Sequence, residues 1–431
     1  MRTRRGEGVR EDERRAIIRD MDHARKLLAV AIVFAGASLG CSRQTVTEPP
    51  KTEVPASAVR VSRPDVDASE PTIAALPNGK FLVGYVEKDD SGKGDLYIRS
   101  FEAPNALGEP VRVNPEPGQV KTWYGDPPTM VVAADGTVYV GWTARYPDSK
   151  KGTLLYVSTS RDGGATFDAP VKVHSDTAPA AHGMHSLAVA PDGRIIAAWL
   201  DERYLLDAKP HSDADGHHNT SVSASPSSNE ESEPNAELYF SVSTDGAKTF
   251  APDRRIDRDV CPCCKTSLAI GNDGTVYLGY RRVYTGSFRH ITLATSKDLQ
   301  TFTEPVQVSD DRWQLEACPV SGPALKIDNG RLAIGWYSGG EAREHGLYLT
   351  HAATPVARTF DAPQKLDTFE GGGTPAWAGH GLLWSSDGTI RDSKTSPPTT
   401  LAQGRNIAAA ENAYAYVSTA EPNKSVWLNL R

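Results

Sequence analysis

Four cysteines have the clearest potential for chemistry in this sequence. Cys261, Cys263 and Cys264 lie in one short segment, Cys-Pro-Cys-Cys, and Cys318 follows further along the chain. An even set of cysteines in an exported protein is most often joined by disulfides, and Cys318 could then pair with one of the other three. Thiolates also bind soft metals, so Cys263, Cys264 and Cys318 together with His185 could instead hold copper or zinc. The sequence leaves both alternatives open.

A second group of candidates consists of charged side chains next to expected strand ends. Carboxylates in such places can act as general acid or base, and the candidates are Asp126, Asp201 and Glu70. Cationic or imidazole side chains can orient an anionic ligand, and the candidates are Arg145, Arg203, Arg281, Arg282 and His182. Charged loop residues are also often solvated or paired with one another, so each candidate has a structural alternative.

An internal repeat predicts where these residues lie. Five segments share a pattern of strand, tight turn with glycine, and second strand ending in an aromatic residue: TIAALPNGKFLVGY, MVVAADGTVYVGW, LAVAPDGRIIAAW, LAIGNDGTVYLGY and ALKIDNGRLAIGW. Their turn glycines are Gly79, Gly136, Gly193, Gly274 and Gly330, which gives spacings of 57, 57, 81 and 56 residues. The long spacing contains a stretch at about 205–236 that is rich in Ser, Asn, Pro and acidic residues, which predicts a disordered insertion.

Each repeat continues into a second hairpin, so the sequence predicts four strands per repeat. In such a unit the first strand begins, and the second strand ends, on the same face. The charged candidates and the four cysteines occupy these positions. We therefore expect them to converge on one mouth of a central channel, which is the default place for a site.

A short motif in the second hairpins carries a family resemblance. It reads Ser-x-Asp-x-Gly-x-Thr-Phe, is complete at Ser160–Phe167, and is approximated at Ser243–Phe250 and Ser296–Phe302. Its Ser and Asp side chains can bond backbone N–H groups of a tight turn, and its Gly permits positive φ. The chain thus resembles the Asp-box (BNR-repeat) β-propellers, whose best known members are sialidases. The resemblance implies an all-β, six-bladed propeller at 58–431, with residues 372–431 as the sixth blade and SAVRVSR as a candidate closing strand.

The resemblance implies a glycan-directed protein, with glycoside hydrolysis as one form of that function. Sialidases use three arginines, a Tyr nucleophile with a Glu partner, and an Asp acid/base. The Arg-Ile-Pro motif that carries the first arginine is absent, because Ser69-Glu70-Pro71 stands there, and TPAW stands where the Tyr is expected. The alternative is a non-enzymatic envelope module that binds a soft metal ion or a protein partner at the same mouth.

The N-terminal region predicts export. Residues 1–40 read as a signal segment, because the apolar run Leu27–Gly40 follows Arg25 and Lys26, and Met21 offers an alternative start of translation. Cys41 ends this run and resembles the lipid-attachment cysteine of bacterial lipoproteins, with 41–57 as a flexible tether. We therefore expect a protein of the bacterial cell envelope, anchored in a membrane through a lipid at Cys41.

Composition narrows the class of partner. The chain has 431 residues and a formal net charge of -7, from 47 basic and 54 acidic side chains. This balance offers no basic field for phosphates, so nucleic acid is excluded as a partner. The expected partner is a glycan or a small anionic ligand, bound by a monomer.

Overall fold

The computed structural model describes residues 55, 57–103, 106–147, 152–206, 235–353, 357–418 and 423–431. These residues belong to one compact unit, which spans Thr52–Arg431. The predicted signal segment, Cys41 and most of the predicted insertion at 205–236 lie outside the described residues. Within the described part of the chain, no helix has the length and apolar character needed to cross a membrane.

Almost all regular structure in the described residues is β-strand. The exception is a 3-10 turn, η1 (Arg203–Leu206). The strands form consecutive four-stranded units, here called blades. The first three blades consist of the following strands: β2 (Asp67–Ala75), β3 (Phe81–Lys88), β4 (Gly94–Glu102) with β5 (Ala106–Leu107) and β6 (Val111–Arg112); β7 (Thr129–Val132), β8 (Val138–Arg145), β9 (Thr153–Ser160) and β10 (Val171–Lys172); β11 (His182–Val189), β12 (Ile195–Asp201), β13 (Ala236–Ser243) and β14 (Arg254–Val260).

The remaining strands complete four more blades. They are β15 (Ser267–Ile270), β16 (Val276–Tyr284), β17 (Phe288–Ser296) and β18 (Val306–Gln307); β19 (Ala324–Asp328), β20 (Arg331–Ser338), β21 (Gly346–Ala353) and β22 (Gln364–Thr368); β23 (Ala376–Ala378), β24 (Gly381–Ser386), β25 (Thr389–Asp392) and β26 (Thr399–Gln403); β27 (Arg405–Ala410), β28 (Ala413–Ser418), β29 (Ser425–Leu430) and β1 (Val59–Arg60). All strand pairs within the blades are antiparallel; for example, β1 pairs with β29 through Val59 and Leu428.

The described residues thus form seven blades, and the prediction of six is wrong. The expected sixth blade, residues 372–431, contains two blades, because their strands are only three to six residues long. The predicted closing segment SAVRVSR does supply β1, which becomes the outer strand of the seventh blade.

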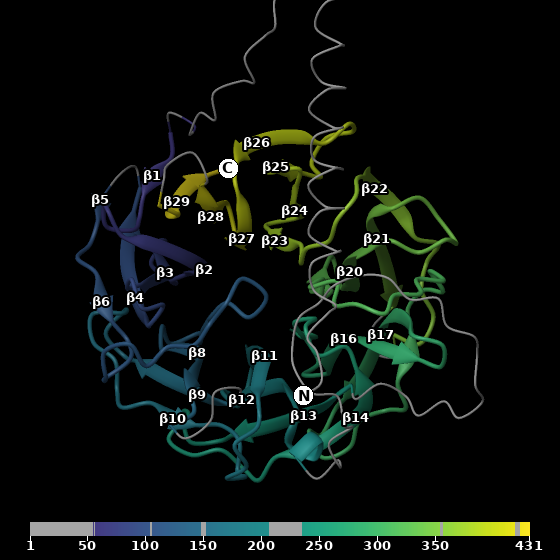
Figure 1. The fold of residues 1–431 in the computed structure, drawn as a ribbon, viewed down its shortest axis with the longest axis horizontal. Helices are drawn as coiled ribbons and strands as arrows, with labels where there is room; N and C mark the ends of the chain where they lie inside the picture. The colour runs from purple at the N-terminus through teal and green to yellow at the C-terminus, as the bar shows by residue number, and fades with distance from the viewer. Residues whose placement is uncertain are drawn as a thin grey trace, which may run out of the picture. The chain divides into compact units, whose positions relative to one another are not determined.

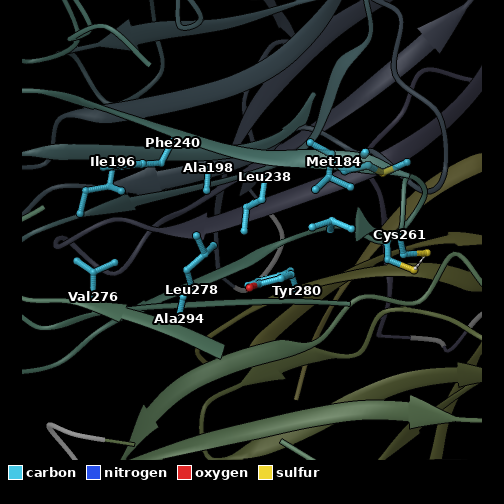
Figure 2. Close-up of a cluster of buried hydrophobic side chains, with 14 of the residues drawn as sticks. Met184, Ile196, Ala198, Leu238, Phe240, Cys261, Val276, Leu278, Tyr280 and Ala294 are labelled. Carbon is cyan, nitrogen blue, oxygen red and sulfur yellow. Dashed lines mark hydrogen bonds between the residues drawn. The ribbon is translucent and has the colours of Figure 1, made fainter. Parts of the chain in front are cut away.

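The blades follow one another around a ring (Figure 1). Each first strand contacts the first strand of the next blade, in the order β2, β7, β11, β15, β19, β23 and β27, and β27 contacts β2. The apolar core is divided in the same way, because one buried cluster lies between each pair of neighbouring blades. Figure 2 shows the cluster between the third and fourth blades, with Val276 at one end and Met184 and Cys261 at the other.

The turns after the third strands have the hydrogen bonds that the Ser-Asp-Thr motif predicts. The Gly164 N–H donates to Ser160 Oγ at 2.8 Å, and the Thr166 N–H donates to Asp162 Oδ1 at 2.9 Å. Ala247, which replaces the motif's glycine in the next copy, has φ 62°, so an L side chain occupies the left-handed region there. These turns stabilise hairpins at the end of the blades where the first strands finish.

Candidate functional site

A cavity of about 650 Å³ lies where the first strands of all seven blades meet. Its wall includes residues from the segments that precede or begin these strands, such as Pro71, Gly125, Thr266, Pro319 and Gly373. The repeat pattern had predicted that these strand starts share one mouth, and they do line one cavity. A cavity of this size is in the range of small-molecule and oligosaccharide sites.

The cavity wall carries two cationic side chains, one of which is paired with a buried carboxylate behind the wall. Among the described residues that line it there is no Asp, Glu or His, and the charged side chains are Lys265 and Arg405. Tyr124, which is 57% exposed, and Trp377 add aromatic surface. The wall therefore combines cationic side chains with apolar and aromatic surface, which suits an anionic ligand with apolar faces.

Asp126, a predicted catalytic residue, lies buried behind this wall. Its Oδ1 is 3.1 Å from His185 Nδ1 and 3.3 Å from Lys265 Nζ. Burial opposes ionisation of Asp126, but Lys265 and His185 outweigh it and hold the pKa of the carboxyl well below its ordinary value. Lys265 also donates to the Pro127 carbonyl at 2.8 Å. Asp126 thus orients Lys265, which is 14% exposed, at the cavity wall.

Asp201, Arg203 and His182 form a separate cluster in the third blade and are absent from the cavity wall. One nitrogen of Arg203, Nη2, lies within 2.8 Å of carboxylate oxygens of Asp176, Asp201 and Asp253. His182 Nε2 is 2.9 Å from Asp176 Oδ2, and the His182 ring stacks on His174 with centroids 3.6 Å apart. The three carboxylates share a guanidinium, so this group is a paired network.

The two stacked imidazoles are expected to titrate in opposite directions from the ordinary histidine pKa of 6.5. Burial lowers the pKa of His174, whereas bonds to Asp176 and the nearby Asp201 overcome burial and raise the pKa of His182. The contribution of His182 to stability is therefore complete below pH 6.5 and is lost as pH rises through its folded pKa. The contribution of His174 is complete above pH 6.5 and is lost as pH falls through its folded pKa. Histidine NMR titration checks this; two midpoints on the same side of 6.5 would contradict it.

The other predicted residues of the first two blades lie outside the cavity wall as well. Glu70 is buried, has φ 50° at a bulge of β2, and its Oε1 is 2.9 Å from Lys88 Nζ. Arg145 is exposed, and its Nη2 donates to the Gly92 carbonyl at 2.8 Å. Both side chains have local structural partners.

Arg281 and Arg282 have different roles although they are adjacent in β16. Arg281 is completely buried and donates to the carbonyls of Ser321, Arg289 and Tyr337. Arg282 is 29% exposed and lies 3.5 Å from Asp257. Arg281 therefore ties the fourth blade to the fifth and is inaccessible to a ligand in the cavity.

Three of the four predicted cysteines, Cys261, Cys263 and Cys264, come together, and all four are free thiols in the described residues. Cys261, Cys263 and Cys264 are buried, whereas Cys318 is exposed and lines the cavity. Each Sγ of the first three lies within 4.8 Å of the others. His185, predicted as a further metal ligand, is held by Asp126 instead.

Sequence reasoning missed four residues of the cavity wall: Lys265, Arg405, Tyr124 and Trp377. Lys265 and Tyr124 could have been found, because each adjoins a segment already placed at a strand start. Arg405 and Trp377 belong to the two short blades that the sequence did not separate.

Comparisons with known proteins support the fold. No family model matches the chain, and no curated protein matches it. Among solved structures, a protein of unknown function from Dyadobacter fermentans has a TM-score of 0.50 at 14% identity, covering 89% of this chain and 100% of that one. An ulvan lyase of polysaccharide lyase family 25, bound to -[GlcA(1-4)Rha3S]-, has a TM-score of 0.51 at 12% identity, covering 86% and 95%. A Hadza microbial sialidase has a TM-score of 0.47 at 14% identity, covering 81% and 75%.

The chain is therefore similar in fold to the ulvan lyase, an enzyme that acts on a polysaccharide. At these identities the likeness extends to the fold alone.

Proposed function

We propose that this protein is an exported, lipid-anchored propeller that recognises an acidic glycan in its central cavity. The observation that carries the proposal is the cavity wall, whose charged side chains among the described residues are Lys265 and Arg405. Arg405 is an exposed cation, and the Lys265 ammonium is oriented by Asp126 and shares its charge with that carboxylate. Together with the neighbouring aromatic surface they suit a sugar that bears carboxylate or sulfate groups. The ulvan lyase with the similar fold is bound to a ligand of this class.

Recognition is favoured over hydrolysis by the same wall. A glycosidase of the usual kind places two carboxyl groups about 5–10 Å apart around the scissile bond. Asp126, Asp201 and Glu70 are all buried, and each is paired with a cation. We therefore propose a binding module, and the apolar run before Cys41 supports its placement in the envelope.

The test is a calorimetric titration with a β-1,4-linked glucuronate oligomer, using the neutral glucose oligomer of equal length as the matched ligand. We expect binding of the acidic oligomer alone, with an affinity that falls as salt is added. No release of shorter sugars is expected on long incubation. Equal binding of both oligomers, or of neither, would contradict the proposal.

Arg405→Gln is expected to weaken binding of the acidic oligomer about tenfold or more, since a charge-assisted bond contributes about 1.5–3 kcal/mol. Arg405 is exposed, so its replacement leaves the fold intact. The matched control is Arg161→Gln, an exposed arginine on the turn after β9, which is absent from the cavity wall. If the control loses as much affinity as Arg405→Gln, the attraction is a general charge effect.

A further inference from the structure

The four cysteines Cys261, Cys263, Cys264 and Cys318 have no part in the proposed function. Cys261, Cys263 and Cys264 belong to the connection between β14 and β15, and Cys318 belongs to the connection between β18 and β19. The Cys264 N–H donates to the Cys261 carbonyl at 3.3 Å, so the chain turns tightly here. Cys261 and Cys264 are spaced as Cys-x-x-Cys, and this turn directs both sulfurs to the same side.

Two contacts hold the connection that contains Cys318 close to the fourth blade and to the connection before it. Arg281 Nε donates to the Ser321 carbonyl at 2.9 Å, which holds the segment after Cys318 against the fourth blade. A Cβ on Gly322 would lie 2.0 Å from the Lys265 carbonyl oxygen, so glycine is required for this approach. This close approach brings the connection that contains Cys318 beside the connection that contains Cys261, Cys263 and Cys264.

The distances between sulfurs are compatible with a shared ion. Thiolates about 2.3 Å from a tetrahedral zinc ion lie about 3.8 Å from one another. Cys261 Sγ is 3.8 Å from Cys263 Sγ and 3.0 Å from Cys264 Sγ. The sulfurs of Cys261, Cys263 and Cys264 already lie within 4.8 Å of one another, so a small adjustment of the turn would place these three around one centre, and Cys318 would move toward them to complete the set.

The surroundings supply compensating charge. Four thiolates around a divalent ion carry a net charge of about -2. Two buried arginines lie near: Arg281 acts electrostatically on Cys264, and Arg289 acts on Cys261 and Cys318. Arg289 is only 3% exposed, and its Nη1 has no hydrogen-bond partner among the described residues. Arg289 Nε donates to the Leu315 carbonyl, three residues before Cys318, so a buried guanidinium with an unpaired donor contacts the same connection and favours negative charge there.

We propose that Cys261, Cys263, Cys264 and Cys318 bind one zinc(II) ion as a tetrathiolate site at the wall of the central cavity. The ion joins the fourth and fifth blades, and the exposed Cys318 gives it a route of entry. Zinc with four thiolates carries a charge of about -2, which the two buried arginines can balance. The ligand set differs from the sequence prediction, because Cys261 takes the place of His185.

The first experiment measures bound metal and thiol state together. The full chain, produced with its own N-terminal segment and purified without oxygen, is examined by native and denaturing mass spectrometry and by elemental analysis. We expect one zinc per chain that is lost on denaturation, with the four cysteines then open to alkylation. Disulfides among these cysteines, or copper without zinc, would overturn the proposal.

The second experiment uses Cys318→Ser, because the exposure of Cys318 makes misfolding the smallest concern. Zinc affinity, measured by competition with a chelator, is expected to fall by more than about 100-fold, since even outer partners of ligands contribute 10–100-fold. Cobalt(II) in place of zinc is expected to show weaker thiolate-to-metal absorption in this variant. Unchanged affinity and absorption would refute the four-thiolate site.

Met184→Leu is the matched control, because it removes a buried sulfur from the same apolar cluster at similar volume. It is expected to retain one zinc per chain. Arg405→Gln is also expected to retain zinc while losing the acidic oligomer, so failure of the metal site and failure of glycan recognition can be told apart.

Discussion

Arg281→Ala is expected to lower the free energy of unfolding by about 3–5 kcal/mol, because three buried carbonyls lose their donor and a cavity forms. The guanidinium joins Ser321 and Tyr337 of the fifth blade to the fourth and lies 4.7 Å from the centre of the Trp313 ring. No water can easily replace it at a position that is completely buried. The measurement is urea-induced unfolding followed by tryptophan fluorescence.

The neighbouring substitution Arg282→Ala provides the control. Arg282 is partly exposed and has one loose ion pair with Asp257, so its loss is expected to cost less than about 1 kcal/mol. Similar losses for both variants would show that the carbonyl bonds of Arg281 contribute little.

Arg203→Ala is expected to destabilise the protein by about 3–5 kcal/mol at neutral pH. It leaves three carboxylates, of Asp176, Asp201 and Asp253, without the cation that they share, and Asp201 and Asp253 are almost fully buried. Arg203→Lys keeps the charge but loses the planar fork, so an intermediate loss is expected.

The pH dependence distinguishes this mechanism from simple loss of packing. In the unsubstituted protein, bonds to His174 and His182 overcome burial and lower the pKa of Asp176 far below 3.8, so its contribution is present at neutral pH and is lost as pH falls. In Arg203→Ala, protonation relieves the repulsion among the carboxylates, so part of the lost stability should return on mild acidification. Chemical unfolding at pH 7 and pH 5 measures this difference. A variant whose deficit is the same at both pH values would contradict it.

The first five repeats could be predicted from sequence because each carries the same local signal. A tight turn with φ 82° at Gly79 and 78° at Gly274 demands glycine, and the flanking strands have apolar residues that fill the spaces between blades. The last two blades lack this signal. Their first hairpins turn at Gly379 and Glu411 between shorter strands. Two blades therefore fit into a segment about as long as one earlier repeat, and the sequence pattern did not separate them.

The location of the site was predictable, but its residues were only partly so. Strand order alone places the strand starts around the cavity, and this follows from the repeat. Whether a charged side chain there faces the ligand depends on what the neighbouring connections bring near it. Asp201 meets Arg203 two residues later, and Glu70 meets Lys88 across one hairpin, so these pairs are local. Asp126 meets Lys265 from another blade, through a contact that no local pattern contains.

The pairing of β1 with β29 determines when the seventh blade can fold during synthesis of the chain. β1 is made first, yet its neighbour Ser62 accepts a hydrogen bond from Val426, which lies 364 residues later. Every other blade can assemble from strands that leave the ribosome together, whereas the seventh must wait for the final residues. The pairing of β1 with β29 is therefore expected to form last, because it closes the longest loop. Before this pairing forms, β29 is an edge strand with unpaired backbone groups. A chain that ends before β29 would keep an open edge permanently and would be prone to pair with other copies of itself.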